Sequence, residues 1–449
     1  MGREKASRSR PACLSGQLGY PRGNLKIEII NTGSELMLGF VLNTHQQWLC
    51  RQLADMGYPV TRQTAVPDSG SAIQDAVREA LARAHLVITT GGLGPTSDDL
   101  TRDYIASLLG RKLQIDKTVL KHVEDFFALR RRPMPPNTAV QALVPEDTLV
   151  LPNANGTAPG LVMEIKAGEF HATNQPGMLV MLPGPPRELR PMFTNQVIPL
   201  IRQRFPAPES FVCRTLKTTG LGESVIQERI DSALKHLTAA GLEVGYCARI
   251  GEVDVRLVGR GGLAEKAVSE AEAIIRALIE HHIFGTGDET LEAVVVRLLT
   301  ERKQTVVLAE SCTGGYIANR LTNISGASVV VWGGLVTYSN DAKQSLLGVR
   351  PETLDAHGAV SEPTAREMAE GARQRSGADY AVAVTGIAGP TGGTPDKPVG
   401  TVFIALAAPG KTKVLKPTNP YDRETFKFVT SQQALEMLRR SLLSEATGS

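Results

Sequence analysis

The chain has 449 residues, of which 42% are hydrophobic, and its formal net charge is only +3. Positive and negative residues are interspersed, so the charge pattern supports neither a polyanion-binding surface nor an acidic partner, and a nucleic-acid ligand is not expected. The five cysteines lack a CxxC spacing or a Cys/His cluster, which argues against a disulfide framework or a zinc site and fits a reducing cytoplasm. No apolar run approaches the roughly 20 residues that a membrane-spanning helix needs.

The first part of the chain has the pattern of a short extension followed by an α/β domain. Residues 1–24 are basic but lack an apolar signal-peptide region, so we expect a disordered extension there. From residue 25 to residue 190, strands alternate with amphipathic helices, which predicts βαβ units and a parallel sheet with ligands at the carboxyl ends of its strands. Strands are expected over residues 25–35, 58–66 and 85–92, and helices over residues 43–57 and 71–84.

The rest of the chain predicts two further domains, in keeping with a prior of roughly 150 residues per domain. Residues 191–287 are expected to form a small α+β domain, and residues 288–445 a second α/β domain. The predicted fold class is therefore α/β, with parallel-sheet domains at both ends and a small α+β domain between them. In the middle domain we expect helices over residues 192–205 and 262–282 and strands over residues 211–220 and 251–260. In the last domain we expect strands over residues 305–310, 329–339, 379–386 and 399–408, with helices over residues 291–303, 315–323, 342–348 and 363–377.

The first domain carries a glycine-rich turn followed by two aspartates, in "TTGGLGPTSDDLTRDYIA". Asp98 and Asp99 at a helix start are typical of carboxylates that complement the helix dipole. Paired carboxylates beside a glycine-rich nest also suit a Mg²⁺-nucleotide, with backbone amides on the phosphate and carboxylates on the metal or its waters. Both interpretations stay open. Glu35, Asn43 and Gly184 follow other strands of the same predicted sheet, which allows one composite site.

Three strand-to-loop junctions of the last domain carry reactive groups. The first is "LAESCTGGYIANRLT", where an apolar strand ends in a carboxylate, a hydroxyl and a thiol, and two glycines open a helix. Ser311 is either an N-cap, a role that Ser and Thr prefer, or a nucleophile close to free backbone N–H groups. Cys312 is the rival nucleophile beside it.

The second junction is "GGLVTYSNDAKQSLLG", in which a strand ends at Tyr338, Ser339 or Asn340 caps the next helix, and Lys343 falls in the first turn. A cation there is unfavourable by roughly 0.3–1 kcal/mol because the helix N-terminus is itself positive, so the position favours neutral lysine. Neutral lysine is the general base of Ser–Lys hydrolases, and a tyrosine hydroxyl nearby could orient the proton. A solvated surface lysine and a strand-end tyrosine are the alternative.

The third junction, "AVTGIAGPTGGTPDKPVGT", is rich in glycine. Such a loop leaves backbone amides unobstructed and allows φ > 0, which favours an anion-binding nest. It has neither the spacing of a Walker motif nor that of a dinucleotide fingerprint. On its own it indicates an anion site only weakly.

Together, "AESCTGG", "VTYSNDAK", "GAVSEPTAREMAEGAR" and "TGIAGPTGGTPDKPVGTV" closely resemble the carboxy-terminal domain of the competence/damage-inducible protein A (CinA) family, the nicotinamide mononucleotide deamidase domain. The resemblance implies hydrolysis of nicotinamide mononucleotide to nicotinic acid mononucleotide and ammonia, without a metal or other cofactor. It also implies that Ser311 is the nucleophile, Lys343 the general base and Tyr338 an assisting hydroxyl, with Cys312 as a neighbour.

The same resemblance assigns substrate binding to the glycine-rich turns and to an arginine near the end of the chain. "NPYDRETF" places Arg423 where the family has an arginine after a Gly-Asp pair, although Tyr421 replaces the glycine. Amide hydrolysis needs an activated hydroxyl, a base and oxyanion donors, and the substrate phosphate needs amide donors, which we expect at the helix start after Gly314 or in the loop over residues 386–393. The expected substrate-binding residues are Thr313, Gly314, Gly315, Thr385, Gly386, Gly389 and Arg423.

The amino-terminal motifs resemble the MoaB/MogA-like molybdopterin-binding domain that opens CinA proteins, and "NANGTAPG" with "RRPMPPNTAVQALVPE" resembles the CinA version in particular. In some family members this domain hydrolyses ADP-ribose with a divalent metal and potassium. The resemblance therefore implies a site for Mg²⁺ or a similar divalent cation at Asp98 and Asp99, with potassium as a second cation. It implies phosphate binding at Gly91, Gly92 and Gly94.

Two alternatives belong to other functional classes: a molybdopterin-binding transferase and a non-enzymatic regulator of DNA uptake or repair. Leu93 and Ser97 stand where molybdopterin adenylyltransferases carry a Gly-Gly-Thr-Gly loop and an Arg-Asp pair, which opposes the first; the balanced charge and the complete Ser/Tyr/Lys set oppose the second. The middle region resembles the KH-type domain of the family, but its "GLGES" is not the basic Gly-X-X-Gly clamp that RNA binding needs. The resemblance further implies a homodimer that acts on small nucleotides, nicotinamide mononucleotide and ADP-ribose, away from membranes.

Overall fold

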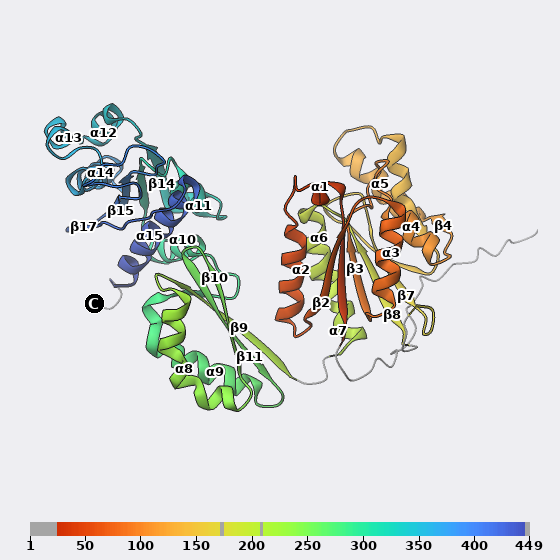
Figure 1. The fold of residues 1–449 in the computed structure, drawn as a ribbon. Coiled ribbons are helices and arrows are strands. Elements are labelled where there is room, and N and C mark those ends of the chain that lie inside the picture. The colour runs from red at the N-terminus through yellow and green to blue at the C-terminus, as the bar shows by residue number, and fades with distance from the viewer. Residues whose placement is uncertain (1–24, 171–174, 207–209, 445–449) are drawn as a thin grey trace, which may run out of the picture. The chain divides into compact units, whose positions relative to one another are not determined.

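A computed structural model describes residues 25–170, 175–206 and 210–444, so the predicted extension over residues 1–24 lies outside the described part. The chain divides into two compact units, residues 1–211 and residues 212–449. In Figure 1 the first unit is coloured from red to yellow-green and the second from green to blue. None of the helices in the described ranges is long and apolar enough to cross a membrane.

A six-stranded sheet forms the centre of the first unit. Its parallel part consists, in spatial order, of β2 (Val60–Val66), β1 (Ile27–Thr32), β3 (Leu86–Thr90) and β8 (Gly177–Leu182). The antiparallel strands β7 (Gly160–Ile165) and β6 (Thr148–Leu151) continue it to the edge. The strands β1, β3 and β8 are buried over their whole length, as expected for a parallel sheet covered on both faces.

Helices cover both faces of this sheet (Figure 1). The helices are α1 (Ser34–Met37), α2 (Thr44–Asp55), α3 (Gly70–Leu81), α4 (Thr101–Leu108), α5 (Lys117–Leu129), α6 (Pro186–Met192) and α7 (Ile198–Arg204), and the small ladder beside them consists of β4 (Leu113–Ile115) and β5 (Leu143–Pro145). The apolar face predicted over residues 71–84 is confirmed, because Ile73, Val77 and Leu81 of α3 are buried. The cores on the two faces make this unit a three-layer α/β domain.

The first unit extends beyond the predicted boundary at residue 190. The segment over residues 192–205, which the sequence assigned to the middle domain, continues the helix that begins at Pro186. It packs Phe193, Val197 and Ile201 into the core of the first unit. The predicted boundary was wrong because the period of an amphipathic helix shows which face is buried but not which sheet covers it.

The middle domain, within the second unit, is the expected α+β domain. Its antiparallel sheet has the order β10-β11-β9-β12, with β10 (Glu243–Arg249), β11 (Glu252–Arg260), β9 (Phe211–Thr219) and β12 (Ile283–Thr286). The helices α8 (Glu223–Ala239) and α9 (Ala264–Ile279) pack against one another and supply most of the helical part of its core (Figure 1). The strand β10 and the helix α8 were absent from the prediction.

The last domain repeats the three-layer arrangement around a mixed sheet. Its parallel strands are β14 (Val331–Val336), β13 (Val306–Glu310) and β15 (Tyr380–Gly386), followed by the antiparallel strands β16 (Val402–Ala408) and β17 (Lys411–Leu415). One core contains α10 (Leu291–Arg302), α11 (Tyr316–Thr322) and α15 (Arg423–Ser444), and the other contains α12 (Asn340–Leu347), α13 (Pro351–His357) and α14 (Glu362–Ser376). The carboxyl ends of β14, β13 and β15 therefore meet at one edge.

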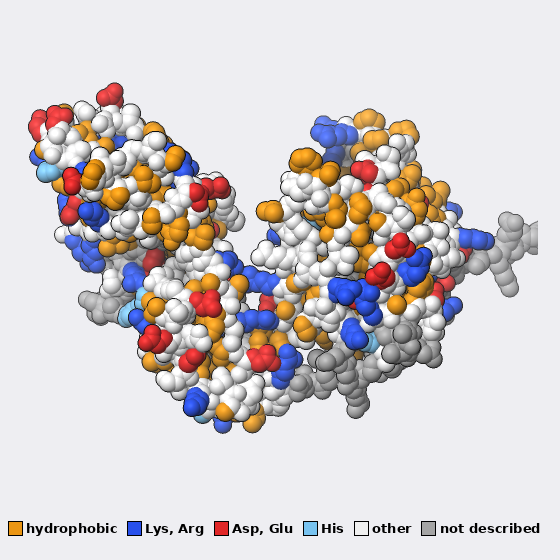
Figure 2. All heavy atoms as spheres, in the orientation of Figure 1, with side chains coloured by type: hydrophobic (Ala, Val, Ile, Leu, Met, Phe, Trp, Pro, Cys, Tyr) orange, Lys and Arg blue, Asp and Glu red, His pale blue; other side chains and the backbone are white. Residues whose placement is uncertain are grey.

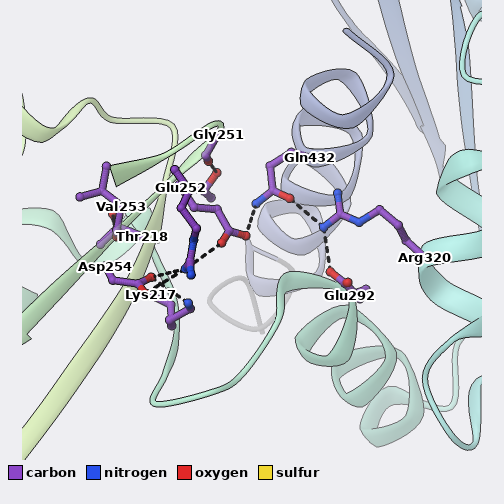
Figure 3. Close-up of polar contacts among 11 residues, drawn as sticks. Lys217, Thr218, Gly251, Glu252, Val253, Asp254, Glu292, Arg320 and Gln432 are labelled. Carbon is purple, nitrogen blue, oxygen red and sulfur yellow. Dashed lines mark hydrogen bonds and ion pairs between the residues drawn. The ribbon is translucent and has the colours of Figure 1, made fainter. Parts of the chain in front are cut away.

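Polar contacts join the middle domain to the last domain (Figure 3). The side chain of Gln432 in α15 donates to Glu252 of β11 at 2.9 Å and accepts from Arg320 of α11 at 2.8 Å. Arg320 also forms an ion pair with Glu292 of α10 at 2.7 Å. Because Gln432 and Arg320 are buried, loss of one partner leaves a buried polar group unpaired, so these contacts specify how the two domains dock.

Candidate active site

The three predicted junctions of the last domain meet at one pocket of 230 Å³. Ser311 follows β13, Tyr338 follows β14, and Thr385 and Gly386 end β15, so the parallel pairing of these strands brings the three segments together. The pocket is lined by Ser311, Cys312, Tyr338, Asn340, Lys343, Ala359, Val360, Thr385, Gly386, Ala388 and Arg423. Of the expected substrate-binding residues, Thr313, Gly314, Gly315 and Gly389 are outside this lining.

The turn after β13 holds Ser311 in a fixed place. Its backbone N–H donates to Val384 of β15 at 2.9 Å, and its carbonyl accepts from the N–H of Gly314 at 3.0 Å. Gly314 and Gly315 have φ angles of 62° and 91°, a left-handed conformation that glycine adopts without strain. Among the described residues, the N–H groups of Cys312 and Thr313 donate to no carbonyl oxygen.

Glu310 explains why the apolar strand ends in a carboxylate. Its side chain is 1% exposed and accepts hydrogen bonds from the backbone N–H groups of Gly315, Ile317 and Ala318 at 3.1, 3.1 and 2.8 Å. The carboxylate therefore satisfies the free N–H groups at the start of α11 and complements its dipole. The expectation that the substrate phosphate binds at this helix start is wrong, because Glu310 already occupies the donors.

Lys343 is brought to the nucleophile by α12. Ser339 caps this helix by accepting from the N–H of Ala342 at 3.1 Å, and Lys343 lies near its start, as predicted. The Lys343 side chain is 1% exposed, and its Nζ lies 3.0 Å from Oγ of Ser311. Its Nζ also donates to the carbonyls of Thr337 at 2.9 Å and Tyr338 at 3.3 Å. The alternative of a solvated surface lysine is therefore wrong.

The surroundings of Lys343 favour its neutral form. Burial lowers the pKa of Lys343 below its ordinary value, and no carboxylate among the described residues forms an ion pair with it. A neutral amine has two N–H donors and one lone pair. Two carbonyl oxygens lie within hydrogen-bond distance to accept the two N–H groups, which leaves the lone pair for the hydroxyl proton of Ser311.

Cys312 has the opposite environment. It is 5% exposed and belongs to the apolar core formed with α10, α11 and α15. Burial raises the pKa of its thiol to about 12, so the thiolate that a cysteine nucleophile needs does not form near neutral pH. Although Cys312 also lines the pocket, this protonation state makes it a poor nucleophile.

Arg423 connects the start of α15 with the other two junctions. Its guanidinium donates to the hydroxyl of Tyr338 at 2.7 Å and to the carbonyl of Gly389 at 3.0 Å. Gly389 therefore positions the arginine through its carbonyl. The Tyr338 side chain is 60% exposed, and among the described residues its hydroxyl has no hydrogen bond to Ser311 or Lys343, so its geometry favours substrate orientation over proton relay.

Other lining residues were not foreseen from the sequence. Ala359 and Val360 follow α13, a helix that the prediction lacked. Thr385 donates from its hydroxyl to the carbonyl of Ala359 at 2.7 Å, so it shapes this wall. The segment "GAVSEPTAREM" contains the signal, since a loop between two elements, here α13 and α14, is a usual place for site residues.

In the first unit, two strand ends bring glycines together. The position of a Cβ on Gly184, after β8, lies 3.7 Å from the Cα of Gly91, after β3. A Cβ on Gly92 would lie 2.0 Å from the hydroxyl oxygen of Thr101, so the turn allows α4 to begin only if residue 92 is glycine. The missing side chains of Gly92 and Gly94 make room for the Thr101 hydroxyl and the Asp99 carboxylate, so only Gly91 and Gly184 bring bare backbone together at these strand ends.

Asp98 and Asp99 do not form the paired carboxylate site at a helix start that the sequence suggested. Both precede α4, whose first turn contains Asp103, so of the two interpretations left open for this pair, carboxylates in the first turn of a helix is the one that the structure contradicts. Asp99 accepts from the N–H of Thr96 at 2.9 Å and holds its own turn, while hydrogen bonding to Thr96 keeps the pKa of the exposed Asp98 below its ordinary value. Among the described residues, no group of three or more His, Cys, Asp or Glu forms a metal cluster. Mg²⁺ is commonly bound by one or two carboxylates together with substrate phosphates and waters. Asp98 and Asp99 fit a site of this kind, in which the substrate supplies part of the coordination.

Glu35 and Asn43 lie on the segment after β1. Asn43 is the predicted cap of α2, since its side chain accepts from the N–H of Gln46 at 3.1 Å. Glu35 is exposed and folds back on Gly33. The segment between these residues exposes five large apolar side chains, Met37, Leu38, Phe40, Val41 and Leu42. Asn43 therefore has a structural role, and Glu35 is free to contact a ligand.

Charge on the surface agrees with the composition. In Figure 2, Lys and Arg side chains are mixed with Asp and Glu side chains over the visible faces of both units. In the middle domain, Arg214 is paired with Glu265 and Glu272 at 2.7 Å, and Lys217 is paired with Asp254 at 2.7 Å. These cations are neutralised by neighbours, which disfavours a phosphate-backbone contact through them.

Sequence comparisons match all three domains in order. Residues 28–203 match the probable molybdopterin binding domain, residues 213–285 the damage-inducible protein CinA KH domain, and residues 288–442 the CinA C-terminal domain. A CinA-like protein of Akkermansia muciniphila is 46% identical over 413 residues, which cover 92% of this chain and 96% of that protein. The chain belongs to the CinA family.

Other CinA relatives agree with this assignment. A putative competence-damage inducible protein of Symbiobacterium thermophilum is 46% identical over 390 residues, which cover 86% of this chain and 89% of that protein. The crystal structure of the competence/damage inducible protein CihA from Agrobacterium tumefaciens is 48% identical and covers 34% of this chain and 93% of that chain, with a TM-score of 0.33. The three family models and the two long relatives confirm the CinA resemblance seen in the sequence motifs.

Proposed function

We propose that the last domain is an amidohydrolase that converts nicotinamide mononucleotide to nicotinic acid mononucleotide and ammonia. The observation that carries the proposal is the 3.0 Å separation between Nζ of a buried lysine, Lys343, and Oγ of Ser311. A nucleophile within hydrogen-bond reach of a base with a lowered pKa is the arrangement that amide hydrolysis through an acyl-enzyme requires.

The reaction follows from this geometry in two halves. Ser311 Oγ attacks the carboxamide carbon while its proton passes to Nζ of Lys343, and the N–H groups of Cys312 and Thr313 stabilise the oxyanion. Lys343 then returns the proton to the amide nitrogen, the C–N bond breaks, and ammonia leaves an ester on Ser311. In the second half, water attacks the ester carbon while Lys343 takes its proton; the bond from carbon to Ser311 Oγ then breaks, and Lys343 returns the proton to Oγ, which gives the carboxylic acid and the free serine hydroxyl.

Arg423 and Tyr338 have a binding role in this proposal. Both line the pocket, and the hydrogen bond between them at 2.7 Å fixes the guanidinium at the pocket wall. Two of the five N–H donors of Arg423 are used by Tyr338 and Gly389, so others remain for the substrate. No step of the reaction uses a metal ion.

A direct assay tests the proposal. The purified chain is incubated with nicotinamide mononucleotide, and ammonia and nicotinic acid mononucleotide are measured with and without EDTA. Stoichiometric formation of both products, unchanged by EDTA, is expected. Absence of ammonia at high enzyme concentration would reject the amidase assignment.

For the first domain we propose metal-dependent hydrolysis of the pyrophosphate bond of ADP-ribose. The supporting observations are the close approach of Gly91 and Gly184 at the carboxyl ends of β3 and β8, and the Asp99 carboxylate against Gly94 in the turn that follows β3. Asp98 and Asp99 would hold a divalent cation together with substrate oxygens, and the cation would neutralise the phosphate charge; potassium is the second expected cation. Release of AMP and ribose 5-phosphate that requires added Mg²⁺ tests this activity separately from ammonia release.

A further inference from the structure

The helix α15 reaches from the pocket of the last domain to the middle domain. Its first residue, Arg423, lines the pocket, whereas Gln432 and Arg439 further along the helix contact the middle domain. Gln432 donates to the side chain of Glu252 at 2.9 Å, and Arg439 donates to the carbonyl of His281 at 2.8 Å. The two contact points are separated by about two helical turns, so they lie on one face of α15. Because both side chains are buried, the helix cannot turn or slide without breaking a buried contact.

Gln432 is the residue that joins the charged groups of the two domains (Figure 3). Its Nε2 donates to Glu252 at 2.9 Å, and its Oε1 accepts from Arg320 at 2.8 Å. An ionised carboxylate can only accept and a guanidinium can only donate, so the amide fits between them in one orientation. The amide therefore fixes α15 against the middle domain by a hydrogen bond whose direction is set by charge.

The helix α11, which follows the nucleophile turn, is held from elsewhere. Near its end, Arg320 forms an ion pair with Glu292 of α10 at 2.7 Å, and at its start Glu310 accepts from three backbone N–H groups. These contacts involve neither α15 nor the middle domain. A change in how α15 meets the middle domain is therefore expected to move Arg423 and to leave Ser311 in place.

We propose that Gln432 is a positioning residue for substrate binding: through its contact with Glu252 it fixes α15, and α15 sets where Arg423 enters the pocket. The inference rests on the proposed function of this site, in which Arg423 binds the substrate. The helix rises about 13–14 Å between Gln432 and Arg423, and a rigid helix carries a displacement over that length. The guanidinium needs this place for its bonds to the hydroxyl of Tyr338 and the carbonyl of Gly389. The middle domain thereby sets the substrate affinity of the last domain and takes no part in bond breaking.

A reciprocal exchange of the two side chains tests the inference, with KM and kcat for ammonia release from nicotinamide mononucleotide measured on the full chain. Gln432→Glu keeps an acceptor for Arg320 but places a second carboxylate against Glu252, so KM should rise about fivefold or more while kcat stays within about twofold. Glu252→Gln alone should stay close to the parent, since glutamine can still accept from the Gln432 amide. The two changes together should restore KM, because the hydrogen bond then forms in the reverse direction. Gln374→Glu, at an exposed position of α14, is the matched control and should change neither constant.

Amide hydrogen exchange measured without substrate gives a second readout. Residues 424–430, at the start of α15, should exchange several-fold faster in Gln432→Glu, return to the parent rate in the double variant and remain unchanged in Gln374→Glu. Ammonia release by the parent chain is measured first. Its absence would reject the amidase reaction, and the exchange rates of residues 424–430 would then decide the role of Gln432.

Three results would overturn the inference. Parental KM and parental exchange in folded Gln432→Glu would show that α15 does not depend on the contact with Glu252. A fall in kcat at unchanged KM would mean that the variant only loses folded protein or disturbs the nucleophile turn. A double variant that stays as impaired as Gln432→Glu would show that the added buried charge, and not the lost hydrogen bond, caused the effect.

Discussion

In the last domain, the strand ends bring Ser311 Oγ and Lys343 Nζ to 3.0 Å, whereas in the first domain they bring Gly91 and Gly184 side by side and leave Asp98 on an exposed turn. Both sites use the carboxyl ends of parallel strands in a three-layer α/β domain. In the last domain the side chains proposed to react already lie within hydrogen-bond distance of one another. In the first domain the strand ends bring together mainly backbone atoms.

This contrast follows from the chemistry that each site is proposed to perform. Amide hydrolysis needs a base and a nucleophile aligned before the substrate arrives, because misalignment by a single ångström is costly. Hydrolysis of a phosphoanhydride relies on a cation that the substrate itself helps to coordinate, so its site is completed by the ligand. The comparison therefore predicts that replacement of one side chain abolishes the amidase activity. It also predicts that the activity of the first domain requires an added cation.

The largest expected effect is that of Ser311→Ala. Without the hydroxyl no acyl-enzyme forms, and ammonia release should fall by about 10⁴-fold or more. Binding of nicotinamide mononucleotide should persist, because the lost atom is small and the lysine remains in place; calorimetry measures it. Substantial ammonia release by this variant would show that the assembled pair is not the reacting pair.

Lys343→Met should have the next largest effect, a loss of about 10²–10⁴-fold in kcat, the usual contribution of a general base. Methionine fills a similar volume, so the variant should remain folded, as checked by circular dichroism and thermal denaturation. Lys343→Arg should be no more active, because guanidinium stays protonated. Near-normal turnover with arginine would make Lys343 a positive charge that contacts substrate and would exclude the Ser–Lys mechanism.

The pH dependence of kcat/KM tests the same pair without a substitution. Burial lowers the pKa of Lys343, and only the neutral amine can accept the proton of Ser311. Activity should therefore be low where the lysine is protonated, rise with pH through its lowered pKa, and level off above that pKa, below the pH at which an ordinary lysine titrates. A profile that falls with rising pH over this range would mean that the protonated lysine is the active form.

In the first domain, Asp99→Asn should reduce Mg²⁺-dependent hydrolysis of ADP-ribose on the order of tenfold, because the amide is a weaker cation ligand. The same change should leave ammonia release intact, and EDTA should abolish only the ADP-ribose reaction. Asp125→Asn, which removes an exposed carboxylate paired with Lys121 on α5, is the matched control and should change neither activity. Equal loss of both activities in Asp99→Asn would show that the two sites are coupled or that folding is damaged.

Much of the last-domain site could be predicted from the sequence, and the reason is local. Ser311, Tyr338 and Lys343 each follow a strong strand pattern, and adjacent parallel strands end at one edge, so their proximity follows from the topology. Arg423 lies on α15, far along the chain, and only the motif resemblance suggested it. The role of Glu310 was missed because a carboxylate at a strand end is compatible with a site or with a cap, and only the hydrogen bonds distinguish them.

The first-domain site was predicted less well, also for a physical reason. A pair such as Asp98 and Asp99 next to glycines is compatible with a helix start, a turn or a metal site, and a difference of a few residues in where α4 begins separates these choices. The predicted domain boundary at residue 190 was wrong for a similar reason. The apolar face of the helix that ends near Phe205 could pack on the sheet of the first domain or on that of the middle domain, and the sequence does not distinguish the two. Long-range packing decides such cases, and it leaves no local signal in the sequence.

The smallest expected effect is that of Cys312→Ala. This variant tests whether a side chain that lines the pocket but has no basic partner among the described residues contributes to the reaction. Cys312 touches the pocket but is held as a thiol by burial, which raises its pKa to about 12, so its removal should change ammonia release by no more than about twofold. Deleting its buried sulfur leaves a small cavity in the core and should cost about 1 kcal/mol of unfolding free energy, measured by denaturant unfolding. The exposed Cys247 of the middle domain provides the control, since Cys247→Ala should alter neither activity nor stability. If Cys312→Ala instead lost activity as completely as Ser311→Ala is expected to, the thiol would be the nucleophile, and proximity to Lys343 would have to be interpreted as activation of the neighbouring sulfur.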